Sequence, residues 1–227
     1  MSHAAQVAID GPAGSGKTTV ARALARELGY LYLDTGAMYR AVALLARTCG
    51  IDPHDEAGLV GALAQRPVRA ATDRAAPRGF RIWLGEQELG DELYGDDLSP
   101  LAAAVAALPG IRELLVAQQR AIASEGPVVM AGRDIGTVVL PAAPVKVFLT
   151  ASLEARAERR AAELARAGQP LAPERVLAEL RRRDYEDENR TVGPLRQAPG
   201  ALVIDASDLS AADVVARIVE RVHAVAA

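Results

Sequence analysis

The sequence predicts an α/β fold in which a mostly parallel sheet is covered by helices on both faces. Short, continuously apolar segments alternate with helix-length segments along the chain, which is the pattern of strands that are buried on both sides. A glycine-rich loop joins the first apolar segment, residues 6–10, to a helical pattern at 19–28 that ends at Gly29. Hydrophobic residues make up 50% of the chain and aromatic residues only 4%, so small aliphatic side chains must fill the core.

The other elements follow in order along the chain. The expected strands of the main sheet are residues 6–10, 30–33, 128–130, 145–149 and 201–204. The expected helices are residues 19–28, 37–48, 59–65, 101–108, 111–124, 152–167, 173–183 and 211–222. Ser152 is the expected N-cap of the helix that it begins. Glycines and prolines interrupt residues 67–100, where 80–84 alternate as a half-exposed strand does, so we expect a small β-rich insert that packs on the main domain.

Composition limits the class of protein. The 227 residues suit one α/β domain with insertions, and the net charge of −3 argues against a surface that coats nucleic acid. The single cysteine, Cys49, excludes an intrachain disulfide framework and is interpreted as a small buried hydrophobic residue in a helix. The three histidines are scattered and predict no metal cluster. We expect a cytoplasmic protein without a membrane span, because no signal peptide precedes the first strand and no run reaches ~18 apolar residues.

The loop at residues 11–18 carries the strongest functional signal. It reads GPAGSGKT and fits G-x-x-x-x-G-K-[ST], the phosphate-binding P-loop. Its glycines let backbone N–H groups turn toward phosphate, and the following helix adds partial positive charge. We expect Lys17 to reach the terminal phosphates and the Thr18 hydroxyl to hold Mg²⁺. The predicted nucleotide-binding residues are Gly11, Pro12, Ala13, Gly14, Ser15, Gly16, Lys17, Thr18 and Thr19.

Two charged clusters follow predicted strands, at the edge where open α/β sheets bind ligands. Residues 34–40, DTGAMYR, are interpreted either as a helix N-cap through Asp34 or Thr35, or as a second anion pocket beside the loop. Residues 131–137, AGRDIGT, place Arg133 and Asp134 between two glycines. This second cluster favours a loop that presents charge to a ligand over a plain surface salt bridge.

Two further clusters lie on predicted helices. Arg183, Asp187 and Arg190 recur at i, i+4 and i+7, so they share one face if the helix continues past residue 183. Such a face could hold ribose hydroxyls through the carboxylate and phosphate through the guanidinium groups, although a solvated helix end is the usual interpretation. Arginines 156, 159 and 160 precede a Gly-Gln-Pro break, and an arginine-rich helix–loop–helix suits a lid over a transferring phosphate.

A P-loop alone does not identify the reaction, since GTPases, motors, transport ATPases and small kinases share it. The chain has no N-K-x-D guanine motif, and transport ATPases need a signature helix and more length. The arginines and carboxylates at several strand ends favour a small kinase. Two alternatives stay open: a kinase for a non-nucleotide acceptor, and a non-catalytic nucleotide-dependent switch.

Taken together and in this order, the motifs resemble those of bacterial cytidylate kinases, which are nucleoside monophosphate kinases. The motifs are D-[ST]-G-x-x-Y-R at 34–40, G-R-D-[IM]-G-T at 132–137 and R-D-x-x-D-x-x-R at 183–190. The resemblance spans essentially the whole chain. It implies one kinase domain with a P-loop core at 1–66 and 101–227, an NMP-binding insert at about 67–100 and a helical lid at about 156–190. It also implies transfer of a phosphoryl group from ATP to CMP and dCMP, with Mg²⁺.

Residue roles come from the same resemblance. The catalytic residues that it implies are Lys17, Arg133, Arg159 and Arg183. The acceptor-binding residues that it implies are Thr35, Tyr39, Arg40, Arg112, Arg133, Asp134, Arg183, Asp187 and Arg190. Residues 205–207 resemble the loop near the adenine of ATP, and Thr18 would hold the metal. The expected partners are small nucleotides alone, with no nucleic acid, no membrane and a monomeric chain.

Three positions depart from the family pattern. Ala103 stands where a serine can bond cytosine, and Ala131 replaces an acidic residue that often precedes Gly-Arg-Asp. Tyr94 stands where an Ile-Arg pair is common, so an arginine is missing there. These departures bear on the choice of CMP over UMP and leave the predicted phosphoryl transfer intact, since the P-loop and the other arginines remain.

Overall fold

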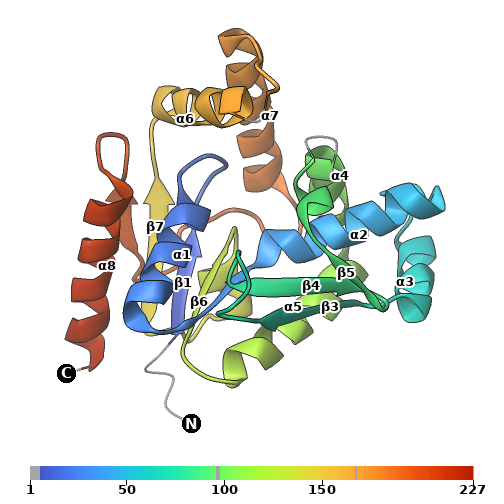
Figure 1. Cartoon of the computed structure of the whole chain (residues 1–227), viewed down its shortest axis with the longest axis horizontal. Helices are drawn as coiled ribbons and strands as arrows, with labels where there is room; N and C mark the ends of the chain where they lie inside the picture. The colour runs from blue at the N-terminus through green and yellow to red at the C-terminus, as the bar shows by residue number, and fades with distance from the viewer. Residues whose placement is uncertain (1–5, 96–97, 167, 227) are drawn as a thin grey trace.

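A five-stranded sheet with the strand order β2-β6-β1-β7-β8 forms the centre of the molecule, and every neighbouring pair of its strands is parallel (Figure 1). The computed structural model describes residues 6–95, 98–166 and 168–226. The strands are β1 (Gln6–Asp10), β2 (Leu31–Asp34), β6 (Val128–Gly132), β7 (Val145–Thr150) and β8 (Leu202–Asp205). In register, Val7 of β1 lies between Val129 and Val145. The predicted α/β class with a parallel sheet is therefore confirmed.

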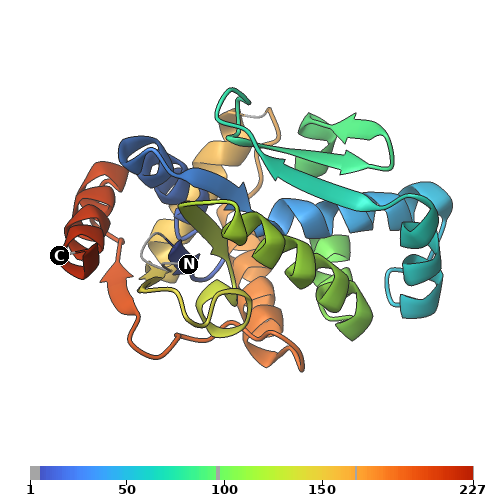
Figure 2. The same ribbon diagram turned by 90° about the horizontal axis from the view of Figure 1, so that it is seen from below.

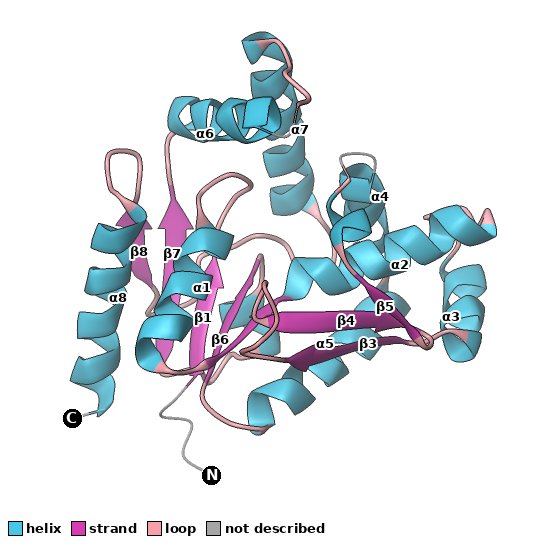
Figure 3. Cartoon of the chain, viewed as in Figure 1, coloured by secondary structure: helices cyan, strands magenta, loops and turns pink. Residues whose placement is uncertain are grey.

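Helices cover both faces of this sheet (Figure 3). The α-helices of the described residues are α1 (Lys17–Leu28), α2 (Thr35–Cys49), α3 (Glu56–Gln65), α4 (Leu98–Val105), α5 (Pro109–Ser124), α6 (Leu153–Arg166), α7 (Pro173–Asn189) and α8 (Ala211–Ala226). Helices α1 and α8 pack against each other on one face, and a π-helical segment, η2 (Ile135–Val139), packs with α5 on the other (Figure 2). Ser152 caps α6 as expected, since its Oγ accepts a hydrogen bond from the Ala155 N–H.

A second, antiparallel sheet with the order β3-β4-β5 packs on α2. Its strands are β3 (Val68–Thr72), β4 (Phe80–Leu84) and β5 (Gln87–Leu89), followed by a 3₁₀ turn, η1 (Asp91–Tyr94). In β4, the side chains at 80, 82 and 84 are buried and those at 81 and 83 are half-exposed, because successive residues of a strand face opposite sides. The alternation of residues 80–84 therefore predicted this strand correctly.

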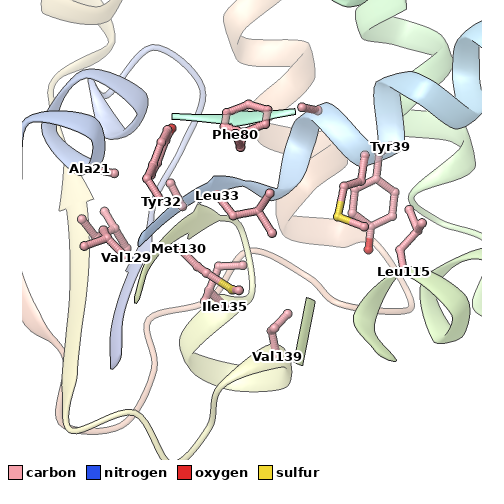
Figure 4. Close-up of a cluster of buried hydrophobic side chains, with 14 of the residues drawn as sticks. Ala21, Tyr32, Leu33, Tyr39, Phe80, Leu115, Val129, Met130, Ile135 and Val139 are labelled. Atoms are coloured by element: carbon pink, nitrogen blue, oxygen red, sulfur yellow. The ribbon is translucent and has the colours of Figure 1, made fainter. Parts of the chain in front are cut away.

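Buried aromatic and aliphatic side chains join the two sheets (Figure 4). Tyr32 of β2 and Phe80 of β4 meet edge to face with ring centroids 5.7 Å apart. Leu33 and Met130, both completely buried, lie in the same cluster. Each such side chain contributes about 1.5–3 kcal/mol through burial, so the β-rich insert is held by the main core.

Helices α6 and α7 enclose a separate, smaller core. It consists of the buried residues Ala13, Ala157, Leu164, Val176 and Leu180. Ala13 is the member from outside the two helices, and it belongs to the loop between β1 and α1. Figure 1 shows α6 lying across the top of the sheet, above that loop. The helix pair therefore packs directly onto the predicted phosphate-binding loop.

Two sequence expectations need correction or adjustment. Cys49 is exposed, so the prediction that it is buried was wrong: it is the last residue of α2, beside the left-handed cap Gly50, and faces away from the core. Helix α7 continues to Asn189 rather than ending at 183, as the shared face of the third cluster required. Within the described residues no single helix could cross a membrane by length and composition; only α4 and α5 taken together could, with a 95° bend between them.

Candidate active site

A cavity of about 790 Å³ lies at the carboxyl-terminal edge of the central strands, where open α/β sheets bind their ligands. The loop after β1 lines one side, and residues from α2, α5, the loop after β6 and α7 line the other. The predicted residues that line it are Ala13, Gly14, Ser15, Gly16, Lys17, Thr18, Thr19, Thr35, Tyr39, Arg40, Arg112, Arg133, Asp134, Arg159, Arg183, Asp187 and Arg190. Gly11 and Pro12 lie at the start of the loop and do not line the cavity. One cavity thus joins the four sequence clusters.

The loop between β1 and α1 depends on close backbone contacts. A Cβ atom on Gly11 would lie 2.0 Å from the carbonyl oxygen of Leu149, so a side chain at this position would displace the loop from β7. Gly14 adopts a left-handed φ of +74°, and its added Cβ would lie 3.3 Å from the Cβ of Arg156. These two positions show why the loop requires glycine.

Lys17 begins α1 and is buried beneath the loop. Its Nζ donates hydrogen bonds to the Pro12 carbonyl at 2.6 Å and to Ser15 Oγ at 3.3 Å. Burial, and then the nearby charge of Arg133, hold the Lys17 pKa well below its usual range. An ammonium group has three N–H donors, so one donor remains for a phosphate oxygen.

Asp10, which the motif analysis missed, ties the loop after β6 to the strand that leads into the phosphate-binding loop. It is the last residue of β1, and its carboxylate accepts hydrogen bonds from the N–H groups of Ile135 and Gly136, each at 2.7 Å. Burial raises the Asp10 pKa to about 6 even though both N–H groups lower it. A carboxylate in an otherwise apolar strand was the available sequence signal.

The side of the cavity opposite the loop, formed by α2, α5, the loop after β6 and α7, is the acceptor wall. On this wall, Asp187 of α7 bridges two arginines. Its Oδ2 accepts a hydrogen bond from Arg133 Nε at 2.6 Å, and its Oδ1 lies 3.2 Å from Arg190 Nη2. Burial alone would raise the Asp187 pKa, but the charges of Arg133 and Arg190 outweigh it and the pKa is lowered. Arg183, one turn earlier, also lines the cavity. The three residues therefore share a face, as their spacing predicted, and Asp187 also orients Arg133.

A second buried pair lies deeper in the same wall. Arg112 of α5 donates from Nη2 to Asp134 Oδ2, and its Nη1 donates to Tyr39 Oη at 3.3 Å. Gly193, in the segment after α7, packs against this pair: an added Cβ would lie 2.3 Å from Arg112 Nη2 and 2.5 Å from Asp134 Oδ2. No sequence motif included Gly193, because its importance comes from a tertiary contact.

Arg40 lies between a carboxylate and an aromatic ring. Its Nη1 is 3.8 Å from Asp34 Oδ2, and its guanidinium carbon is 5.2 Å from the centroid of the Tyr94 ring. The guanidinium of Arg78 lies 3.7 Å from the same centroid. Among the described residues, the buried Arg40 Nη1 has no hydrogen-bond partner, and a buried donor of this kind suits an anionic ligand. Tyr94 therefore supplies a ring that positions Arg40.

The remaining predicted residues are placed as follows. Asp34, rather than Thr35, caps α2 by accepting from the Gly36 N–H at 3.0 Å. Thr35 Oγ1 donates to the Ala131 carbonyl at 3.0 Å. Arg159 lines the cavity and donates to the Ala206 carbonyl in the 205–207 loop. Arg156 is buried and does not line the cavity, unlike the other two arginines of the fourth cluster.

The donor set fits Mg²⁺ carried by nucleotide phosphates better than a metal held by protein alone. Thr18 is exposed and lines the cavity, and the Asp34 carboxylate lines it too. In the described part of the chain, no group of three or more His, Cys, Asp or Glu residues could hold a metal ion. Mg²⁺ usually keeps several waters and binds one or two protein oxygens together with substrate phosphates, which agrees with this arrangement.

Fold and cavity together define an α/β protein of the P-loop class. The cytidylate kinase family model matches residues 7–224. The cytidylate kinase of Mycobacterium avium (strain 104) is 51% identical over 216 residues, which cover 95% of this chain and 93% of that protein. That of Pelotomaculum thermopropionicum is 48% identical over 224 residues, which cover 99% and 98%. The chain belongs to the cytidylate kinase family, so the resemblance stated from the motifs is confirmed.

Among solved structures, an uncharacterized protein from Eubacterium ventriosum aligns over 96% of this chain and 98% of its own. The TM-score is 0.52 and the sequence identity is 14%. At that identity the likeness concerns the fold alone.

Proposed function

We propose that the protein transfers the γ-phosphoryl group of ATP to CMP and dCMP, which yields CDP or dCDP and ADP. One observation carries this proposal: a single cavity has a phosphate-binding loop on one side and an arginine–aspartate wall on the other. Two phosphate-bearing ligands can therefore meet between them. Membership of the cytidylate kinase family supports the choice of acceptor.

The reaction requires positioning and charge stabilisation rather than covalent catalysis. An oxygen of the acceptor phosphate attacks the γ-phosphorus in line, and the bond from that phosphorus to the bridging oxygen breaks, so the electron pair leaves with ADP. The acceptor phosphate is already largely ionised at pH 7, since its second pKa is about 6, and no strong base is needed. Lys17 would meet the donor phosphates, and Arg40, Arg133 and Arg183 would meet charge on the acceptor side.

Mg²⁺, which Thr18 would hold together with phosphate oxygens, supplies positive charge against the triphosphate. Arg159 reaches the cavity from α6, and its bond to the Ala206 carbonyl places it beside the 205–207 loop. We assign this loop to the adenine end of ATP, and Arg159 to the phosphates that change charge during transfer.

We also propose that residues 156–190 act as a lid and that residues 67–100 form the NMP-binding insert. The proposed enzyme is monomeric and cytoplasmic.

The Arg112–Asp134 pair is suited to read the base. A carboxylate accepts from the cytosine amino group, whereas uracil has a carbonyl oxygen at that position, which would face the carboxylate unfavourably. An unpaired buried polar group costs roughly 1–3 kcal/mol, so CMP should exceed UMP by about ten- to a hundredfold in kcat/KM. Ala103 lines the cavity and has no hydroxyl group to bind the base. We therefore expect the ratio of kcat/KM for CMP to that for UMP to lie toward the lower end of this range.

An acceptor panel tests the proposal. We expect ADP release, followed in a coupled assay, to require CMP or dCMP, to be weaker with UMP and to be absent with shikimate or gluconate. Asp134→Asn should narrow the margin between CMP and UMP, because an amide can also donate to a carbonyl. Equal use of CMP and UMP by the wild type would indicate a broader pyrimidine kinase. Turnover with only a non-nucleotide acceptor would overturn the proposal.

A further inference from the structure

Arg156 makes a set of contacts that no step of the proposed reaction uses. It lies on α6, is only 6% exposed and does not line the cavity. Its Nε donates to the Ala151 carbonyl at 3.1 Å, and its Nη1 donates to the Ala13 carbonyl at 3.0 Å. The same guanidinium forms a bidentate ion pair with Asp184 of α7, from Nη1 to Oδ1 at 3.0 Å and from Nη2 to Oδ2 at 2.7 Å. One side chain therefore connects α6, α7, the end of β7 and the phosphate-binding loop.

The bond to Ala13 orients the peptide that leads to Gly14. In a planar trans peptide, the carbonyl and the N–H point in opposite directions. When the Ala13 carbonyl points at Arg156, the N–H of Gly14 must point away from it. Gly14 lines the cavity, so the contact with Arg156 fixes the orientation of an N–H group in the part of the loop that a phosphate would approach.

The other end of the connection lies on the acceptor wall. Asp184 follows Arg183, and Asp187, which binds Arg133, lies one helical turn further along α7. The Ala13 methyl group also packs in the core shared by α6 and α7, with Val176 and Leu180. An acceptor that fixes α7 through Arg183 and Asp187 would therefore also fix Asp184, Arg156 and the loop peptide.

We propose that Arg156 is a positioning residue which, with Asp184, couples the acceptor site to the donor loop, so that each ligand binds more tightly when the other is bound. This inference rests on the proposed function for the identity of the two ligands. Planar two-point contact is a property of arginine that lysine cannot reproduce. The coupling should therefore depend on the geometry of the guanidinium and not only on its charge.

The test measures binding in both orders by titration calorimetry. The β,γ-imido analogue of ATP, with Mg²⁺, is titrated into the protein with and without saturating CMP, and CMP is titrated with and without the analogue. In the wild type we expect the Kd of each ligand to fall at least ~5-fold when the other is present, by the same factor in both directions. In Arg156→Lys that factor should fall below about 2, while the Kd of CMP alone stays within about twofold of wild type.

Two further variants make the result decisive. Asp184→Asn keeps one hydrogen-bond acceptor but loses the charge. We therefore expect it to lower the coupling factor, as Arg156→Lys does. If Arg156→Lys does not fold, Asp184→Asn alone tests the inference. Arg182→Lys, at an exposed ion pair on the same helix α7, should keep the wild-type factor. Wild-type coupling in both Arg156→Lys and Asp184→Asn would overturn the inference, as would an uncoupled wild type. Turnover of CMP by the wild type is assayed separately, so failure of the inference and failure of the proposed function are distinguishable.

Discussion

The phosphate-binding loop takes its polar groups from consecutive residues, 11–19, whereas the facing wall takes its charged side chains from α2, α5, the loop after β6 and α7. The loop works mainly through its backbone, and its single cation, Lys17, is held by the loop itself. The wall works through side chains that hold one another in pairs, Arg112 with Asp134 and Asp187 with Arg133. Substitutions should therefore act very differently in the two regions: one cation dominates the loop, and charge is shared across the wall.

The largest expected effect is on the loop side. Lys17→Ala should lower kcat by about a thousandfold or more, because no other cation of the loop can meet the charge that develops on the γ-phosphoryl oxygens. The measurement is coupled ADP release with CMP, with circular dichroism to show that the fold is intact. Lys146→Ala is the matched control, since Lys146 is the other lysine in the sequence and lies half-buried on β7. Near-normal turnover in folded Lys17→Ala would show that Lys17 does not dominate the loop and that the loop and the wall do not differ in this way.

Substitutions in the acceptor wall should lower activity less than Lys17→Ala does. Arg183→Ala should lower kcat/KM for CMP by about ten- to a hundredfold, since a charge-assisted hydrogen bond to phosphate contributes ~1.5–3 kcal/mol. Asp187→Ala should act in the same direction, through the loss of ribose contacts and of its hold on Arg133. Arg182→Ala is the control, because Arg182 is an exposed arginine of the same helix that pairs with Glu186 and does not itself line the cavity. Wild-type acceptor kinetics in both wall variants would show that Arg183 and Asp187 do not contact the acceptor.

The last and smallest expected effect is on stability rather than on turnover, and it concerns Asp10, which links the loop after β6 to the strand before the phosphate-binding loop. Its pKa of about 6 lies above the ordinary value of 3.8, so its contribution to stability is fully present below pH 4, falls between pH 4 and 6, and is absent above that range. The free energy of unfolding of the wild type, relative to Asp10→Asn, should therefore rise by up to about 3 kcal/mol as the pH falls from 7 to 4. Chemical denaturation across this range measures it. A difference that stays constant with pH would show that Asp10 has an ordinary pKa in the folded protein.

How far the sequence predicted this molecule depends on how local each feature is. The loop at 11–18 is a contiguous motif, so its position and Lys17 followed from the sequence alone. The shared face of Arg183, Asp187 and Arg190 followed from helical spacing, which needs only local geometry. The parallel sheet followed from the length and apolarity of its strands.

The remaining features depend on contacts between distant segments. The sequence placed Asp187 near ribose, but it could not show that Asp187 also binds Arg133, because Arg133 comes from the distant loop after β6. Arg156 lies in a run of arginines, and nothing in that run indicated which one turns inward to Ala13. Cys49 was assigned to the core because apolar residues precede it, although the last turn of α2 has left the core.

Gly193 limits how the acceptor wall can vary. Gly193 does not line the cavity, but it has a left-handed φ of +60° and the Arg112–Asp134 pair packs directly against its Cα. Any side chain there would push Arg112 and Asp134 out of their present positions, and so would alter the acceptor wall from behind. The acceptor range of this protein can therefore change at a position that no acceptor touches, and a comparison of cavity-lining residues alone would miss it.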